Sequence, residues 1–379
     1  MKKLLTIAKD SQIKVSSQIT EFLEPENVYL PINIENINNM HKKNVKKGEL
    51  LYQFDDLNIY SPISGKIVGV LNKKQKYFLV IKNDYHEEDL YKGANEFTTV
   101  NIKTDFEEKI KCYANFNWQL LDNAKEIVLN GIEDEPYIAN KTFLHCYETS
   151  EILQMLDMIA RTFKLESILI CLKENDRESI EAFNKFLGTY PNILIKILPD
   201  YYPIGNEILL RDYLKLSSTS VIFSTEKIYD IYSNVIRERV NDTTFVTITG
   251  DAINNPQVFK VKIGSLLQEV IKDNIKIKEK KYDLFVNGIM KRTVAQLEDI
   301  IITENIRAVY FMKKRSYLKQ DCVHCGKCNE VCPLNCNPYL SYITKKDFNM
   351  DNCIRCGLCT FICPSYIEID DILNKKGDK

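Results

Sequence analysis

Nine of the twelve cysteines lie close together near the end of the chain, between Cys322 and Cys363. The spacing C-x2-C-x2-C-x3-C-P occurs there twice, in CVHCGKCNEVCP (322–333) and CIRCGLCTFICP (353–364). The start of the chain lacks the long apolar run of a signal peptide, and clustered cysteines in such a chain favour metal over disulfide bonds. Structural zinc usually takes separated cysteine pairs, so two complete four-cysteine runs predict iron–sulfur chemistry.

This spacing is typical of bacterial proteins with two clusters, in which the fourth cysteine of each run binds the cluster of the other run. We therefore expect two [4Fe–4S] clusters. The first predicted ligand set is Cys322, Cys325, Cys328 and Cys363. The second predicted ligand set is Cys353, Cys356, Cys359 and Cys332. Cubes linked in this way lie close enough to pass electrons, which predicts an electron relay; clusters that only hold the fold are the alternative.

Four other cysteines fall outside the predicted ligand sets. Cys336, just after the first run, is interpreted as a thiol that packs like a small hydrophobic side chain, and the alternatives are that it replaces a lost ligand or takes part in redox exchange. Cys112, Cys146 and Cys171 have no partners at metal spacing, and Cys171 lies in an apolar run that predicts a core strand. His324, inside the first run, is expected to be a polar neighbour of a cluster rather than a ligand.

The bulk composition is that of a globular protein of several domains. The length of 379 residues suggests two to four domains, and 51 basic residues nearly balance 52 acidic ones. The near-zero net charge predicts no attraction to nucleic acid. The longest apolar runs have the length of strands, so we expect no membrane span. We expect a cytoplasmic location, or a peripheral one at the inner face of the cell membrane.

The elements that must position the cysteines change character along the chain. Residues 28–82 are predicted to form short strands, with the proline-containing run 28–34 at an edge. Strand and helix patterns then alternate, which predicts a mostly parallel sheet. Its predicted strands are 126–130, 167–172, 193–198 and 220–224. Residues 243–313 return to short strands with one helix, which predicts a small α+β module.

Two predicted helices of the alternating region carry start signals. Thr149 or Ser150 is expected to cap the first, whose apolar residues recur at helical spacing up to Phe163. Asn175 and Glu178 predict a capping box for the second.

Four further stretches carry a resemblance to a known family. They are VKKGELL…SPISGKIVGV (45–70), NGIEDEPYI (130–138), LPDYYPIGNE (198–207) and TITGDAINNP (247–256). With these and the cysteine runs, the chain from about residue 20 to 370 resembles the RnfC-like family of iron–sulfur electron-transfer proteins. That family includes RnfC of the Rnf electron transport complexes and the proline reductase-associated electron transfer protein PrdC.

The resemblance implies a multidomain α/β and α+β fold of four parts. These are an N-terminal barrel-sandwich hybrid (1–90), a Rossmann-like parallel α/β domain (91–240), a β-grasp-like SLBB module (241–315) and a ferredoxin-like domain with two clusters (316–379). The first part also resembles biotinyl and lipoyl carriers. Its hairpin at 53–65 has no lysine to carry the group, so a docking or packing module is expected instead.

The resemblance also implies an electron relay through both clusters to a partner reductase. The protein is then an oxidoreductase component or electron carrier rather than a stand-alone enzyme, and its partners are redox proteins. A PrdC-like role beside a cytosolic reductase is favoured. The alternative is an RnfC-type subunit of a membrane ion-translocating ferredoxin:NAD oxidoreductase, with flavin-dependent NADH oxidation.

One departure from the family concerns flavin. The family resembles the complex I flavoprotein subunit, which binds FMN and NADH through a glycine-rich loop before the acidic motif. Here no glycine occurs between Gly93 and Gly131. Close approach of backbone to phosphate favours residues without a Cβ, so we do not expect FMN or NADH to bind in the family manner. Glu133 and Glu135, which would contact ribose hydroxyls or the nicotinamide, are expected to mark the fold of a degenerate nucleotide site.

Overall fold

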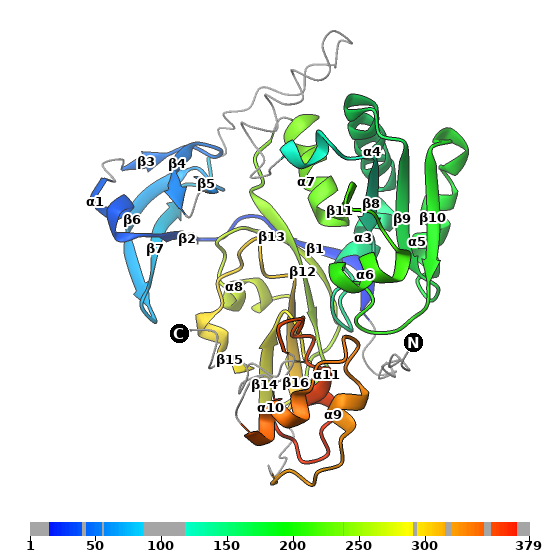
Figure 1. Cartoon of the computed structure of the whole chain (residues 1–379). Coiled ribbons are helices and arrows are strands. Elements are labelled where there is room, and N and C mark those ends of the chain that lie inside the picture. Colours follow the sequence, from blue (N-terminus) through cyan, green and yellow to red (C-terminus); the bar gives the residue numbers. More distant parts are fainter. Residues whose placement is uncertain are drawn as a thin grey trace.

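The computed structural model describes residues 15–39, 43–54, 57–86, 118–237, 239–290, 294–314, 320–344 and 350–369. Within these ranges the chain forms a six-stranded sheet, two four-stranded sheets and a two-stranded ribbon. Figure 1 shows the N-terminal strands (blue) on one side, the α/β unit (green) on the other, and the six-stranded sheet between them. No helix in the described ranges is long and apolar enough to cross a membrane.

The α/β unit is built on a parallel sheet in the order β10-β9-β8-β11, which confirms the predicted strands. The strands are β8 Glu126–Asn130, β9 Ser167–Lys173, β10 Ile193–Leu198 and β11 Ser220–Ser224. Along β8, Ile127 and Leu129 pack into one apolar cluster and Val128 into another. Both faces of the sheet are therefore covered, which is why its strands are continuous apolar runs.

Helices cover this sheet on both faces. They are α3 Asn140–Tyr147, α4 Thr149–Phe163, α5 Arg177–Asn184, α6 Glu207–Leu214 and α7 Thr225–Val235, with 3-10 turns η1 Trp118–Leu121 and η2 Leu187–Thr189. The predicted caps are wrong by one residue. The residue before α4 is Glu148, with no side-chain cap, because α3 runs almost directly into α4 and Thr149 donates to the carbonyl of His145 instead. The cap of α5 is Asp176, whose carboxylate accepts from Ser179 N–H.

The central unit of the molecule is built on the six-stranded sheet, whose strand order is β1-β13-β12-β16-β14-β15. Its strands are β1 Ser16–Phe22, β12 Thr243–Thr249, β13 Gln257–Lys262, β14 Tyr282–Val286, β15 Val294–Ala295 and β16 Ala308–Lys313, with α8 Leu267–Ile271 and η3 Leu297–Asp299 beside them. The strand β1 pairs in parallel with β13, far away in the sequence. The N-terminal segment therefore contributes to two different sheets.

The N-terminal unit consists of the sheet β2-β7-β6-β3 and the ribbon β4-β5. Its elements are β2 Asn27–Ile32, α1 Ile34–Asn39, β3 Asn44–Val45, β4 Leu50–Phe54, β5 Leu57–Tyr60, β6 Gly65–Lys73 and β7 Lys76–Asn83. The proline-containing strand β2 lies at an edge of its sheet, as predicted. It contacts the central unit where Tyr29 N–H donates to the carbonyl of Gly264, over 2.9 Å.

The cysteine region forms a small domain of short helices at the lower end of the molecule, drawn orange and red in Figure 1. Its helices are α9 Lys327–Glu330, α10 Pro338–Thr344 and α11 Leu358–Ile362. Val331 and Leu358 from this domain share an apolar cluster with Tyr202 of the α/β unit and Met290 of the central unit. The cysteine domain therefore packs on two loops that belong to other units.

Candidate iron–sulfur centre

The two cysteine runs fold alike, so the repeat in sequence is also a repeat in structure. Each run ends in a short helix, α9 or α11. Equivalent positions in the two runs share left-handed backbone at closely similar φ values: His324 and Arg355 (54° and 51°), Gly326 and Gly357 (73° and 76°), and Asn335 and Tyr366 (53° and 54°). Left-handed residues in a short loop can turn amide hydrogens toward an anionic group. One such contact is present, from Arg355 N–H to Cys353 Sγ at 3.4 Å.

The first candidate site is a cavity to which both runs contribute. Three of its cysteines, Cys322, Cys325 and Cys328, come from the first run, and Cys363 comes from the second. Its other walls include aromatic and aliphatic side chains of α10 and of the segment after Cys363. The space in front of Gly326 is open, since a Cβ there would meet nothing within 4 Å. Four thiols around one hollow are the donor set that a [4Fe–4S] cluster requires.

The Cys328 thiol of this site is protonated at neutral pH when no metal binds it. Burial is the main cause that raises the pKa of the Cys328 thiol to about 11, and the nearby Cys325 and Cys363 make smaller contributions to this rise. Metal binding to such a group must therefore release a proton.

The second candidate site lies where the first run meets the second. Cys336, which is only 4% exposed, shares a side-chain hydrogen bond with Cys332 there and interacts electrostatically with Cys353. Burial raises the pKa of Cys336 to about 12, and Cys332 and Cys353 add to the rise. Spacing in the sequence did not predict Cys336 beside ligands of the second set.

The loop of the second run is held from outside the cysteine domain. The Tyr202 hydroxyl donates to the carbonyl of Cys356 over 2.7 Å. At Gly357 a Cβ would lie 2.6 Å from the carbonyl oxygen of Met290, so only glycine allows this close approach. The second run is thus fixed to the α/β and central units, whereas Cys325 of the first run is exposed.

A site for a single metal ion would have a different geometry. In the described part of the chain, no three or more His, Cys, Asp or Glu side chains surround a point that would hold one metal ion. A zinc ion would bring its sulfur ligands to about 2.3 Å from a common point, whereas the four thiolates of a [4Fe–4S] cube bind four different irons.

The acidic motif of the α/β unit is used for internal contacts. Glu133 Oε1 accepts from the N–H groups of Lys141 and Thr142, at 2.7 and 3.1 Å, and so caps the start of α3. Burial raises the pKa of Glu133 to about 8, although Lys141 opposes the rise. Glu133 therefore lies at a helix end, where it accepts from two backbone N–H groups of α3.

A buried lysine fills the space beside this motif. The Lys141 side chain is 1% exposed, and its ammonium donates to the carbonyl of Ile132 at 2.6 Å and to Asp134 at 2.9 Å. Burial alone would lower the pKa of Lys141, but Asp134, Glu226 and Glu133 outweigh burial and raise it. Lys141 is therefore a permanent internal cation.

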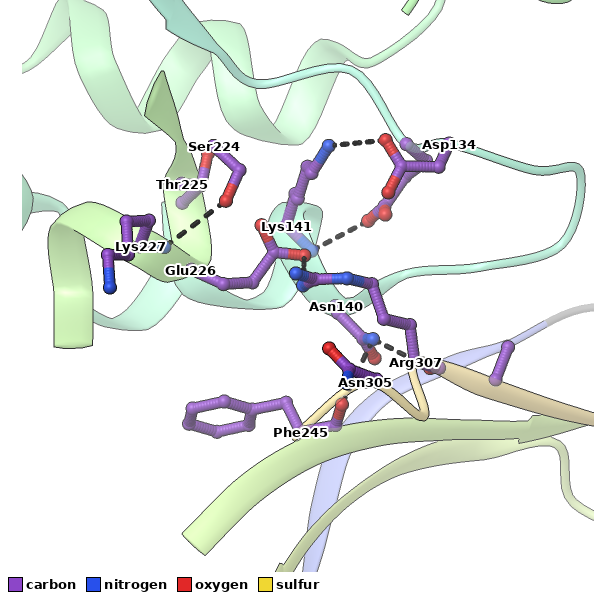
Figure 2. Close-up of polar contacts among 12 residues, drawn as sticks. Asp134, Asn140, Lys141, Ser224, Thr225, Glu226, Lys227, Phe245, Asn305 and Arg307 are labelled. Carbon is purple, nitrogen blue, oxygen red and sulfur yellow. Dashed lines mark hydrogen bonds and ion pairs between the residues drawn. The ribbon is translucent and has the colours of Figure 1, made fainter. Parts of the chain in front are cut away.

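The same polar cluster joins the α/β unit to the six-stranded sheet, as Figure 2 shows. Arg307 contacts Glu226 of α7 at 2.7 Å. The Asn140 amide donates to the carbonyls of Arg307 (2.7 Å) and Phe245 (3.1 Å). The charged groups beside the acidic motif thus hold two units together.

Glu135 connects the acidic motif to the cysteine domain. Its carboxylate lies 2.9 Å from the hydroxyl of Tyr202, the residue that also contacts Cys356. The Cα of Gly288 approaches so closely that a Cβ there would lie 2.7 Å from the Glu135 carboxyl carbon. Tyr202 and Lys141 were not singled out from the sequence; the LPDYYPIGNE stretch that contains Tyr202 was noted only for its family resemblance.

The glycines near the acidic motif bear on whether a flavin could bind there. A Cβ at Gly131 would lie 2.8 Å from His145, and a Cβ at Gly205 would lie 2.9 Å from Ile132. With Gly288 against Glu135, each of these glycines faces protein atoms rather than an open cradle. The segment that would carry the phosphate loop, 110–117 included, lies outside the described residues. The described glycines around the acidic motif therefore offer no open backbone cradle for a phosphate.

The remaining predicted residues have simple environments. Cys171 is fully buried in β9, which confirms the predicted core position. Cys146 lies 4.0 Å from Glu178, and Cys112 lies outside the described residues. His324 Nδ1 is 2.9 Å from the hydroxyl of Tyr339, so His324 is a polar neighbour in the first run.

Family models match two parts of the chain. Residues 106–219 match the Nuo51 FMN-binding domain, and residues 314–364 match a 4Fe-4S dicluster domain. The chain is 26% identical, over 65% of its length, to a subunit of the Na(+)-translocating ferredoxin:NAD(+) oxidoreductase complex of Acetobacterium woodii. It is 25% identical, over 79% of its length and 70% of the relative, to a subunit of the ion-translocating oxidoreductase complex of Buchnera aphidicola. By these matches the chain is similar to the RnfC-like proteins over most of its length. The resemblance stated from the sequence is therefore confirmed.

The matched region spans about half of the Acetobacterium protein (55%) and about a third of one from Haemophilus influenzae (36%). A crystal structure of an NAD+-reducing [NiFe]-hydrogenase is similar over 56% of this chain and 46% of that one, at 14% identity and a TM-score of 0.45. The dicluster match includes all eight predicted ligands and confirms the expectation of 4Fe–4S binding in this region.

Proposed function

We propose that this RnfC-like protein relays electrons, one at a time, through two [4Fe–4S] clusters as the iron–sulfur subunit of an Rnf-type redox complex. The observation that carries the proposal is the cavity lined by Cys322, Cys325 and Cys328 together with Cys363. A hollow shared by the two runs is what a pair of interlocked clusters requires, because each run then supplies the fourth ligand of the other.

The ligand assignment follows from this cavity and its counterpart. The first cluster is bound by Cys322, Cys325, Cys328 and Cys363. The second cluster is bound by Cys353, Cys356, Cys359 and Cys332. The interactions of Cys336 with both Cys332 and Cys353 support the second set. When bound, the clusters supply the redox chemistry, and the protein holds the thiolates in place and excludes water around them.

The two clusters differ in their surroundings, and this suggests a role for each. The first run has an exposed cysteine, Cys325, so the first cluster is the one that meets a redox partner. The second run is fixed to the α/β unit through Tyr202 and to the central unit through Met290. The second cluster therefore exchanges electrons with the interior side of the protein.

A second candidate function is flavin-dependent NADH oxidation. One observation favours it, namely the match of residues 106–219 to an FMN-binding domain. Against it stands the packing around the acidic motif, where Lys141, Glu133 and the nearby glycines are in contact with protein atoms. We propose that electrons come from a redox protein and that FMN and NADH are not bound by these residues.

The finer architecture is part of the same proposal. The N-terminal strands are interpreted as a barrel-sandwich hybrid (1–90), the parallel unit as the complex I-like α/β domain (91–240), the central sheet as an SLBB-type module (241–315) and the cysteine domain as ferredoxin-like (316–379). The alternation of β and α elements and the sheet orders support these assignments. The proposed partners are the electron donor and acceptor, in a reductase or an Rnf-type membrane complex at the inner face of the cell membrane.

The ligand assignment is tested with the Cys363→Ala variant, prepared without oxygen. Wild-type protein should contain about eight irons per chain and, after reduction with dithionite, show the electron paramagnetic resonance of two [4Fe–4S]+ clusters. Cys363→Ala should damage the cluster of the 322–328 loop and spare the one bound by its own run. Damage to the cluster of its own run instead would contradict the crossed assignment, and wild-type protein without iron would contradict the function.

A further inference from the structure

The segments that follow the two fourth cysteines have the same backbone but differ at one side chain. In the first run the segment is Cys332-Pro-Leu-Asn-Cys336, and in the second it is Cys363-Pro-Ser-Tyr-Ile367. The third residue after each fourth cysteine has left-handed φ, and its N–H lies 3.4 or 3.2 Å from the carbonyl of that cysteine. The next residue, Cys336 or Ile367, therefore occupies an equivalent position in both runs.

This equivalent position faces a cluster site. Ile367 lines the cavity of the first site, together with Cys363 and the three cysteines of the first run. By the same local geometry, Cys336 should line the second site. A separate observation agrees, because Cys336 is buried, shares a side-chain hydrogen bond with Cys332 and interacts electrostatically with Cys353, and both are members of the second ligand set.

We propose that Cys336 is a second ligand position for the iron that Cys332 binds, so that the second cluster can exchange one cysteine thiolate for another. This inference rests on the proposed function, since it needs the cluster to be present. Three cysteines of the 353–359 loop leave one iron of the cube to a thiol from the other run. The first run supplies two candidate thiols for this iron, Cys332 and Cys336, which are four residues apart.

The difference in exposure between the two thiols indicates when the exchange occurs. Cys332 lines a cleft between the cysteine domain and the α/β unit, bordered by Tyr201, Tyr213 and Lys215. Cys336 is shielded from solvent. An oxidant or competing ligand that enters the cleft therefore reaches Cys332 first, and Cys336 is the protected replacement.

The exchange balances in atoms and charge. The bond between iron and Cys332 Sγ breaks, and a bond between the same iron and Cys336 Sγ forms. Cys336 gives up its thiol proton, and the released Cys332 thiolate takes up a proton. The iron keeps its oxidation state, and no further reactant is needed.

The experiment compares the fourth cysteines of the two runs in the full-length protein, reconstituted without oxygen. Cys332→Ala should keep about eight irons, because Cys336 takes the open position. Cys363→Ala has Ile367 at the equivalent place and should fall to about seven irons or fewer, with the resonance of an oxidised [3Fe–4S] cluster. Cys332→Ala combined with Cys336→Ile should lose iron as Cys363→Ala does.

The inference is overturned if Cys332→Ala by itself loses as much iron as Cys363→Ala. Wild-type protein that lacks about eight irons would overturn the proposed function instead. Should Cys332→Ala not fold, Cys336→Ile in an otherwise unchanged chain gives a second test. Its second cluster should be lost several-fold faster than in wild type on exposure to air, and an unchanged rate would contradict the exchange.

Discussion

The cysteine domain and the acidic motif of the α/β unit teach opposite lessons about what a family motif means. Both match family patterns in sequence. Around the first cysteine run, thiols surround a hollow and Gly326 faces open space. Around the acidic motif, a buried lysine and closely packed glycines contact other protein atoms. The first region is shaped to hold a cofactor, whereas the second is shaped to hold two units of the protein together.

At neutral pH, the largest expected effect concerns Lys141, the buried cation beside the acidic motif. Lys141→Met should lower the free energy of unfolding by about 3 kcal/mol, because it leaves the Asp134 carboxylate and the Ile132 carbonyl without the ammonium that they contact. The value is at the lower end of the usual range since Asp134 is half exposed. Denaturant unfolding measures it. Lys125→Met, which removes an exposed pair with Glu166, is the matched control and should cost less than about 1 kcal/mol. An equal loss of unfolding free energy in the two variants would show that the buried contacts of Lys141 do not stabilise the fold more than a surface ion pair does.

The packing of the α/β unit also predicts a dependence on pH. His145 is fully buried between Ser179 (2.8 Å) and Thr225 (2.7 Å), and burial lowers its pKa to about 3. Between about pH 6.5 and 3 the unfolded chain binds the proton that the folded chain does not. Stability should therefore be fully present above pH 6.5 and fall by up to about 1.4 kcal/mol per pH unit below it.

His145→Gln should flatten this decline, as measured by unfolding midpoints across pH. Replacement of His86, an exposed histidine of the N-terminal unit, should leave the pH profile as it is. A steep decline that survives in His145→Gln would assign the effect to other groups.

The two cysteine runs can be compared through their glycines, which share the same φ. Gly326→Ala should cost about 1 kcal/mol from left-handed backbone alone. Gly357→Ala should cost about 2 to 3 kcal/mol, because its Cβ also meets the carbonyl of Met290 at 2.6 Å. Iron content and thermal midpoints measure the difference, and we expect Gly357→Ala to lose iron from the second cluster. If Gly326→Ala lowers the iron content and the thermal midpoint as much as Gly357→Ala does, the close contact between Gly357 and Met290 does not contribute to stability.

The smallest expected effect is on the potential of one cluster. Tyr202→Phe removes the hydrogen bond to the Cys356 carbonyl, which in the wild type polarises the peptide before Gly357. The second cluster should become harder to reduce by no more than about 40 mV, since one hydrogen bond contributes about 1 kcal/mol net. A redox titration followed by electron paramagnetic resonance measures both clusters. Tyr201→Phe is the control, and a shift of the first cluster would contradict the assignment.

The sequence predicted the elements whose signal is local. The strands of the α/β unit were found because each is an uninterrupted apolar run that the sheet buries on both faces. The helix α3 was missed because its buried face includes Asn140, Lys141 and His145, which break the apolar period. The strand β1 was missed because its partner β13 lies in another part of the chain.

The candidate site likewise contains residues that a local sequence pattern predicts and residues that only the folded chain brings together. The cysteine positions could be predicted because metal chemistry demands their spacing within a short segment. The contacts of Tyr202 with Glu135 and Cys356 join three segments that are distant in the sequence, so no local sequence pattern predicts them. The role of Cys336 needed the equivalence with Ile367, which only the folded repeat provides.

The central claim is that the cysteine domain holds two clusters while the acidic motif holds no flavin nucleotide. The most direct test is the absorption spectrum of the purified protein, recorded without oxygen before and after addition of NADH and then dithionite. We predict cluster absorption without bound flavin, no bleaching by NADH and full bleaching by dithionite. Flavin in the purified protein, or bleaching of the clusters by NADH, would contradict the claim.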